Sequence, residues 1–211
     1  MKIASRREVD VNSLWPGSPI EGTGGALSPD GGRAALLYLR DGEVYLSLFE
    51  IDSAIALTYE LVDTVRPQTL SWSPDGGMVA TFAPSAGAPG ITDIWVLHLD
   101  RHELICLTAG LAGHASFPSW SPDGKWLVFN SYEPPLRPDH PPHLYAAQLD
   151  PALLTQLTWG PAIDRFPQIS PDGENVVFHR NGDLWLLKPG DQPTPLTHTG
   201  DLRATAPPGP V

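Results

Sequence analysis

The sequence predicts an all-β protein, specifically a β-propeller of four four-stranded antiparallel blades. The tetrapeptide Ser-Pro-Asp-Gly occurs four times, at 28–31, 73–76, 121–124 and 170–173, with spacings of 45, 48 and 49 residues. Two further markers follow each copy in the same order: an aliphatic–aromatic–aliphatic triplet (44–46, 94–96, 144–146, 184–186) and then Leu-Thr (57–58, 107–108, 157–158, 196–197). A repeat of this length that carries four strand signals is typical of a propeller blade.

Each unit contains four short runs with strand character. In the third unit, Phe117–Trp120 leads into the turn, and the β-prone runs Lys125–Asn130, His143–Leu149 and Leu153–Thr158 follow it. In the turn itself, Pro presets φ, Asp tolerates the next position and Gly closes the loop. The chain has no sustained apolar period of 3.6 residues, so we expect less than about 10% helix, against a usual third.

The second and third strands of two units are joined by dipeptides that favour tight hairpins, Asp41-Gly42 and Asn181-Gly182. These signals divide the chain into a lead-in (1–22), four blades (about 23–65, 66–114, 115–164 and 165–200) and a tail (201–211). The lead-in is a candidate for a strand that covers the seam of the ring, with 9–14 as the best segment.

The third unit resembles the TolB-type propeller repeat, a WD40-like family of blades. The resemblance rests on Phe-Pro-Ser-Trp-Ser-Pro-Asp-Gly-Lys-Trp-Leu-Val-Phe at 117–129, with Leu144-Tyr145 and Leu157-Thr158, and it extends over about 23–200. It implies the fold more than a function, because related blades serve in envelope proteins, in peptidase lids and in scaffolds. Two units depart from the pattern, with Leu27 and Ile169 where Trp72 and Trp120 stand.

Such propellers commonly have six or more blades, whereas this chain has four. Three arrangements are therefore open: a closed four-bladed monomer, an open half-ring that joins a second copy into eight blades, and a remnant of a longer propeller. The sequence favours the monomer, since joining two chains carries an association cost.

Composition excludes several classes of function. The net charge of −11, with no basic run, disfavours nucleic acid and anionic membrane surfaces as partners. The single cysteine, Cys106, is expected to be a small buried residue and permits no intrachain disulfide. Arg6 and Arg7 are followed by no apolar segment, so the sequence predicts neither a signal peptide nor a membrane span, and hence a cytoplasmic protein.

Alternating strand direction places the long, irregular loops on the face opposite the Ser-Pro-Asp-Gly turns, and loops on a rigid scaffold commonly carry binding. The proline-rich insert 132–143 is the longest of them and could act as a stiff contact arm. The candidate partner- or ligand-binding residues come from these loops: Arg66, His114, Trp159, Asp164, Arg165, Tyr132, Arg137 and His140.

Catalytic and metal chemistry find little support in the sequence. Nucleophile elbows, phosphate-binding glycine loops and zinc signatures are missing from it, so we predict no cofactor, no metal and no catalytic residue. A metal site from Asp139, His140 and His143 is disfavoured by the prolines between them, and the four turn aspartates are expected to bond their own turns. The prediction is a non-catalytic protein-interaction or scaffold module that binds through the long-loop face and could be a subunit of a larger assembly. The alternative is a ligand-binding or hydrolytic propeller that uses the mouth of its channel.

Overall fold

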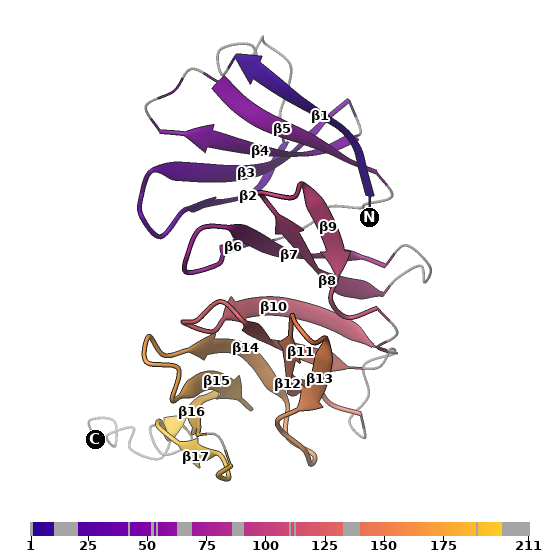
Figure 1. The fold of residues 1–211 in the computed structure, drawn as a ribbon. Coiled ribbons are helices and arrows are strands. Elements are labelled where there is room, and N and C mark those ends of the chain that lie inside the picture. The colour runs from indigo at the N-terminus through magenta and orange to yellow at the C-terminus, as the bar shows by residue number, and fades with distance from the viewer. Residues whose placement is uncertain are drawn as a thin grey trace, which may run out of the picture.

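The computed structural model describes residues 2–10, 21–41, 43–51, 53, 55–62, 69–85, 91–109, 111, 113–132, 140–188 and 190–199. All the elements named within these ranges are strands, and they form four antiparallel sheets. The predicted all-β, propeller-like fold is confirmed. Figure 1 shows the sheets one after another in chain order, with the first and the last at opposite ends of the row.

The strands follow the repeat closely. The first sheet has the order β1-β5-β4-β3-β2, and the other three run in chain order from β6, β10 and β14. The bounds are β1 Lys2–Asp10, β2 Glu21–Leu27, β3 Arg33–Arg40, β4 Glu43–Glu50, β5 Ile55–Val62, β6 Ser71–Trp72, β7 Met78–Pro84, β8 Thr92–His98, β9 Glu103–Cys106, β10 His114–Trp120, β11 Trp126–Tyr132, β12 His143–Gln148, β13 Leu153–Gln156, β14 Asp164–Ile169, β15 Val176–Arg180, β16 Asp183–Leu187 and β17 Thr194–Pro195.

The lead-in supplies a fifth strand to the first sheet. β1 pairs antiparallel with β5, from Lys2 opposite Val62 to Asp10 opposite Ile55. Of the segment 9–14 that the sequence suggests for the seam, residues 9 and 10 belong to this strand, and 11–14 lie outside the described residues. Within the described residues the lead-in therefore extends one sheet at its edge.

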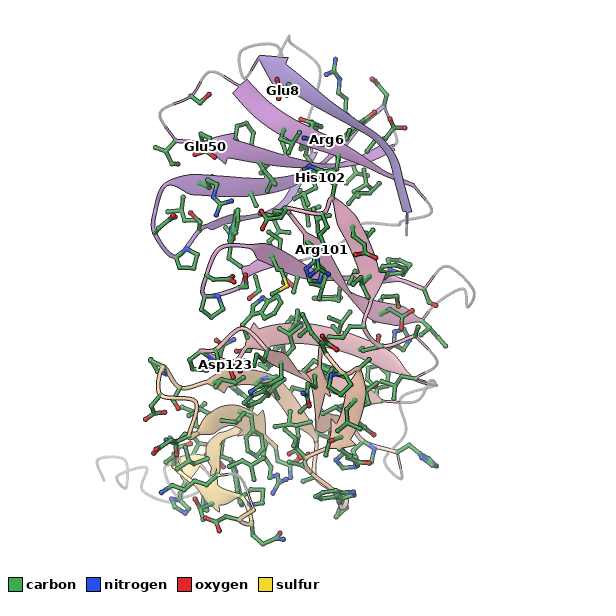
Figure 2. The ribbon with its side chains drawn as sticks, in the orientation of Figure 1. Arg6, Glu8, Glu50, Arg101, His102 and Asp123 are labelled. Atoms are coloured by element: carbon green, nitrogen blue, oxygen red, sulfur yellow. The ribbon has the colours of Figure 1, made fainter. Side chains whose placement is uncertain are left out.

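Each Ser-Pro-Asp-Gly turn is closed by its own side chains. In the third turn, the Ser121 hydroxyl donates to Asp123 Oδ1 at 2.6 Å, and the same oxygen accepts the Lys125 amide at 3.1 Å. These bonds lower the pKa of Asp123, the serine hydroxyl first and the backbone amide second. The other three turns repeat this arrangement, and Figure 2 shows Asp123 in its hairpin at the edge of the third sheet. The turn aspartates are thus structural residues.

The core consists of the layers between adjacent sheets. Trp72 and Trp120 are each 7% exposed and pack against the sheet that precedes their own. Their indole N–H groups donate to backbone carbonyls of that preceding sheet, Trp72 to Ala26 at 3.1 Å and Trp120 to Ser71 at 3.0 Å. A tryptophan at this position therefore fills the layer and also fixes the register between neighbouring sheets.

A polar contact reinforces the first layer. The Tyr59 hydroxyl and His102 Nδ1 lie 2.8 Å apart, which ties β5 to the tip of the β8–β9 hairpin, where Figure 2 labels His102. Cys106 is half-buried beside this layer, and burial raises the pKa of its thiol to about 11. Among the described residues, no helix has the length and apolar character that crossing a membrane requires.

Candidate functional site

Three of the sequence-predicted site residues, His114, Tyr132 and Arg165, line one pocket. The pocket has a volume of about 340 Å³ and lies where β8 and β10 begin, where β11 ends and beside β14. These strand ends belong to the face opposite the Ser-Pro-Asp-Gly turns. The remaining lining residues are Phe82, Thr92, Ser116, Phe117, Asn130 and Phe166.

Two of the aromatic residues sit on irregular points of their strands. Phe117 and Phe166 have φ values of 58° and 55°, in the left-handed region that non-glycine residues seldom occupy. The pairing register shifts around each of them, between Ser116 and Ser119 in β10 and between Arg165 and Gln168 in β14. Such bulges re-aim side chains, and strained positions concentrate at functional sites.

The bulges create a row of rings across three sheets. Phe117 lies between Phe82 and Phe166, with ring centroids 5.2 Å and 4.5 Å away, and the second pair meets edge to face. His179 continues the row, 5.8 Å from Phe166. Phe166 is 44% exposed, so the row includes an accessible apolar surface.

A neutral histidine forms another part of the pocket wall. The His114 ring stacks on Tyr132 with centroids 4.9 Å apart, and its Nδ1 lies 3.3 Å from Thr92 Oγ1. The Thr92 hydroxyl donates to the Ala115 carbonyl at 2.9 Å. Burial lowers the pKa of His114 from its usual 6.5, so the imidazole is uncharged at neutral pH.

The polar groups deeper in the wall hold the bulge of β14 in place. Asn130 donates through Nδ2 to Ser116 Oγ at 2.9 Å, and its Oδ1 accepts the Phe166 amide at 3.3 Å. In contrast, the Arg165 side chain has no hydrogen-bond or ion-pair partner among the described residues. Arg165 is thus the cationic group that the pocket offers to a ligand.

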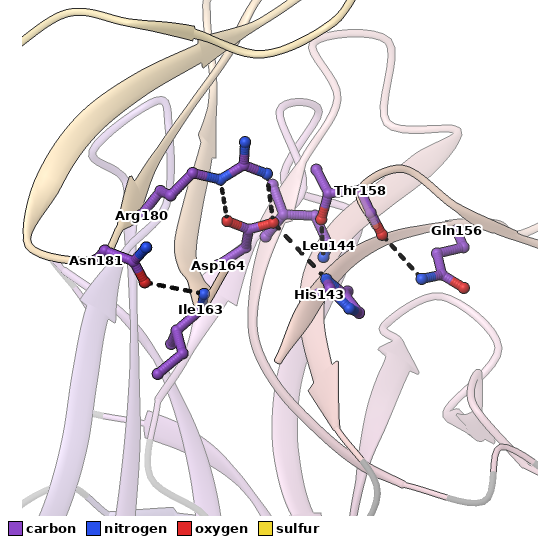
Figure 3. Close-up of polar contacts among 8 residues, drawn as sticks. All are labelled: His143, Leu144, Gln156, Thr158, Ile163, Asp164, Arg180 and Asn181. Carbon is purple, nitrogen blue, oxygen red and sulfur yellow. Dashed lines mark hydrogen bonds and ion pairs between the residues drawn. The ribbon is translucent and has the colours of Figure 1, made fainter. Parts of the chain in front are cut away.

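Asp164 has a different role from its neighbour. Its carboxylate is fully buried and accepts two hydrogen bonds from Arg180, from Nε at 2.6 Å and from Nη2 at 2.8 Å (Figure 3). His143 Nδ1 lies 3.8 Å from Asp164 Oδ2 and is a buried nitrogen that has no hydrogen-bond partner within the described ranges. Burial lowers the pKa of His143, an effect that the nearby carboxylate partly opposes. Asp164 therefore stabilises the pairing of β14 with β15. Its burial argues against the role in partner or ligand binding that the sequence suggests.

Two further described candidates, Trp159 and His140, are not among the residues that line the pocket. Trp159 is 65% exposed in the connection after β13, and His140 is exposed before β12. Arg66 and Arg137 lie outside the described residues, as does Asp139 of the disfavoured metal site. Within the part of the chain that the structure describes, no three His, Cys, Asp or Glu residues are arranged to hold a metal ion.

Sequence reasoning missed the aromatic half of the site. Phe117 and Phe166 hold the same place in the repeat, each followed by proline, and this pairing was the available signal. Proline leaves its own strand position without a backbone donor, which favours a bulge there. Phe82 and Asn130 carry no comparable mark, since only the packing of adjacent sheets brings them to the pocket.

Comparison with known proteins places the fold. No protein-family model matches the chain. An uncharacterized protein of Agrobacterium fabrum is 31% identical over 107 residues, which cover 51% of this chain and 33% of that protein. TolB from Acinetobacter baumannii superposes with a TM-score of 0.60 at 19% identity, over 85% of this chain and 44% of TolB. An oligogalacturonate lyase from Vibrio parahaemolyticus gives 0.66 at 15% identity, over 92% and 60%.

The four stacked antiparallel sheets and these superpositions show that the chain has a fold of the β-propeller class. More particularly, the chain has the TolB-like propeller fold that its repeat predicts. The chain spans a third of the Agrobacterium protein and less than half of the Acinetobacter TolB.

Proposed function

We propose that this protein is a non-catalytic interaction module that holds an extended segment of a partner protein at the pocket. In this proposal a carboxylate of the partner meets Arg165, and a neighbouring apolar side chain lies against Phe117 and Phe166. The observation that carries the proposal is an arginine without a partner among the described residues, beside the exposed Phe166 ring and the partly buried Phe117 ring, both on strained bulges.

The electrostatics of the pocket suit an acidic segment. The net charge of −11 opposes an acidic segment at long range, so in this proposal the attraction is local and comes from Arg165. The adjacent carboxylate, Asp164, is already neutralised by Arg180 and does not compete for Arg165. Arginine binds carboxylates through two parallel hydrogen bonds, which adds orientation to affinity.

The lining also suits recognition better than acid–base chemistry. Its titratable side chains are His114, Tyr132 and Arg165, and the nearest polar contact of the histidine is the hydroxyl of Thr92. Among these lining residues, no carboxylate stands next to a nucleophile. A volume of about 340 Å³ lies at the low end of ligand pockets, and this favours one or two side chains of a peptide.

A second candidate function is a receptor or enzyme for a small anionic molecule. Solved structures with the same fold include an oligogalacturonate lyase and a puromycin hydrolase. An arginine beside aromatic faces also fits an acidic sugar. The remaining sequence-based alternative, a remnant of a longer propeller, is compatible with either binding role.

Selection of peptides from a random phage-displayed library tests the first proposal. We expect the selected peptides to carry Asp or Glu next to an apolar residue. Binding measured by fluorescence anisotropy should weaken at least about tenfold for Arg165→Gln, the loss of one charge-assisted contact. Lys125→Gln, in an exposed turn on the opposite face, is the matched control and should bind normally.

Two outcomes count against the proposal. Peptide binding that is insensitive to Arg165 and Phe166 would place the contact elsewhere. Failure to select any peptide, together with Arg165-dependent binding of oligogalacturonate, would favour the small-ligand alternative.

A further inference from the structure

Apolar layers join each pair of adjacent sheets. The outer face of the first sheet has the residue pattern that the second and third sheets use to pack against the sheet before them. Leu27 occupies the repeat position of Trp72 and Trp120, directly before the Ser-Pro-Asp-Gly turn. Those tryptophans are 7% exposed because each packs on a preceding sheet, whereas Leu27 is 64% exposed. The side of the first sheet on which Leu27 lies is therefore built like the layer-forming side of the second and third sheets.

The same face is hollowed and apolar. A depression of about 560 Å³ lies on it, lined among others by Gly25, Leu27, Ala34, Leu36, Phe49 and Ile51. Ala34 and Phe49 are opposite each other in the β3–β4 pair, at the positions that Val79 and Leu97 hold in the second sheet. Val79 and Leu97 are 2% and 1% exposed, in contact with the first sheet. The other half of this face, around Tyr38 and Ala56, is already buried within the chain.

The last sheet carries the complementary open half. Leu184, in β16, holds the repeat position of Ile94 and Leu144. Both of those residues are fully buried against the next sheet, whereas Leu184 is 36% exposed. Val177 and Leu186, which lie opposite each other on the same face, are only half-buried. The apolar pattern of an inner layer thus continues onto a surface that faces no further sheet in Figure 1.

The Ser-Pro-Asp-Gly turns show the same difference between the first sheet and the later sheets. Pro74 Cδ lies 3.8 Å from the site that a β-carbon would occupy on Gly124, and Pro122 Cδ lies 3.3 Å from the corresponding site on Gly173. The prolines of the second and third turns therefore contact the glycines of the third and fourth, and at Gly76 of the second turn the contact comes from Arg33 Nη2, at 2.7 Å. At the first turn, no atom of the part of the chain that the structure describes lies within 4 Å of that site on Gly31.

We propose that the two open faces are the two halves of one joint, and that a second copy of this chain occupies them. The last sheet of one copy packs on the first sheet of the other, with Leu184 and Val177 over the Leu27 hollow, as adjacent sheets pack within the chain. Continuity with the three existing layers supports a second copy, because each copy presents both complementary halves. Two such joints close two copies into a twofold ring of eight sheets. This assembly is independent of the proposed pocket function.

Mass measurement by analytical ultracentrifugation tests the assembly. We expect twice 22.8 kDa for the intact chain. Leu27→Glu and Leu184→Glu each place a charge in the joint, so each variant alone should sediment as a monomer. Lys125→Glu, an exposed change away from both faces, is the control and should remain dimeric, and circular dichroism checks that every variant keeps its strands.

Mixing the two variants identifies which faces meet. The Leu27→Glu chain keeps an intact last sheet, and the Leu184→Glu chain keeps an intact first sheet, so one undamaged joint can form between them. We expect a heterodimer in the mixture, about tenfold or more tighter than either variant with itself. A dimer that contacts like faces would not recover on mixing. That result, or a monomeric intact chain at about 100 μM, would overturn the proposal.

Discussion

Phe117 and Phe166 meet edge to face, with ring centroids 4.5 Å apart, and both have a left-handed backbone conformation at the same place in their repeats. The contact joins the third and fourth sheets at the pocket. It exists because each strand bulges before its proline, which turns the preceding ring toward the neighbouring sheet. The pocket thus depends on a backbone conformation that most residues avoid.

Substitution of Phe166 tests whether its backbone is strained. At φ 55° an alanine keeps the steric cost of a β-carbon, whereas glycine does not. We expect Phe166→Gly to be more stable to urea than Phe166→Ala, by about 0.5–1 kcal/mol. Gln168, exposed on the same strand without a positive φ, is the matched control, and there glycine should be the less stable replacement. The same order of stability at both positions would contradict the strain.

The repeat allowed most of the fold to be predicted from particular residues. The strands expected at 125–130, 143–149 and 153–158 are observed at 126–132, 143–148 and 153–156. The lead-in was predicted as a possible seam strand at 9–14, but its strand at 2–10 and the pairing of that strand with β5 were not, because 2–10 lies outside the repeat. It is specified by pairing with β5, a contact distant in sequence.

The residues that line the candidate pocket were predicted only in part, for a similar reason. Strand direction was enough to bring His114, Tyr132 and Arg165 to one end of neighbouring sheets. The partner of Asp164 was missed, because Arg180 is opposite it in the β14–β15 register rather than next to it in sequence. The register of a strand pair follows from packing and turn geometry. It cannot be inferred from knowing which loop residues are charged.

The buried ion pair between Asp164 and Arg180 should contribute strongly to the specific packing of the last sheet. Removing one member leaves a buried charge without a partner, so Asp164→Ala should lower the free energy of unfolding by about 3–5 kcal/mol. Arg40, whose contact with the exposed Asp41 is 3.8 Å long, is the control. Arg40→Gln should cost less than about 1 kcal/mol in the same denaturant titration. Equal effects of the two changes would show that Asp164 is solvated.

Double replacement separates the pair from its surroundings. Asp164→Leu with Arg180→Met removes both charges, and we expect it to be more stable than either single variant, since no buried charge remains unpaired. The Arg180 guanidinium also lies over the Trp185 ring, 4.9 Å from its centroid, and the unbranched methionine keeps much of that packing. Additive losses in the double variant would argue against coupling.

Stability near neutral pH should depend on His143. Because burial lowers its pKa in the folded protein below the usual 6.5, the unfolded chain binds the proton more readily. Stability is then highest above about pH 6.5 and falls as the pH decreases from there toward the folded pKa. His143→Gln should flatten the change in melting temperature across this window, and His114→Gln, whose pKa is lowered in the same direction, should flatten it further. If the melting temperature of the double variant falls as steeply over this pH range as that of the unmodified protein, neither histidine causes the pH dependence.

The third turn should be a stability element without a binding role. Asp123→Ala removes the acceptor for the Ser121 hydroxyl and the Lys125 amide, at a cost of about 0.5–1.5 kcal/mol in a urea titration. Because the turn lies on the face opposite the pocket, peptide affinity should be unchanged. Asp123→Asn, which keeps a carbonyl acceptor, should recover part of the lost stability. Lost affinity with unchanged stability would assign this aspartate to a binding surface.

Two glycines of the repeat separate backbone strain from contact between sheets. Gly31 and Gly173 have φ values of 72° and 76°, so alanine is strained equally at both. Only at Gly173 does a β-carbon also meet a neighbouring turn, with Pro122 Cδ 3.3 Å away. We therefore expect Gly173→Ala to cost about 1 kcal/mol more than Gly31→Ala. Both should be measured in the Leu184→Glu background, which prevents a second copy from reaching Gly31. In the intact chain the difference should shrink, because the proposed joint brings a turn proline onto Gly31, and an unchanged difference would count against that joint.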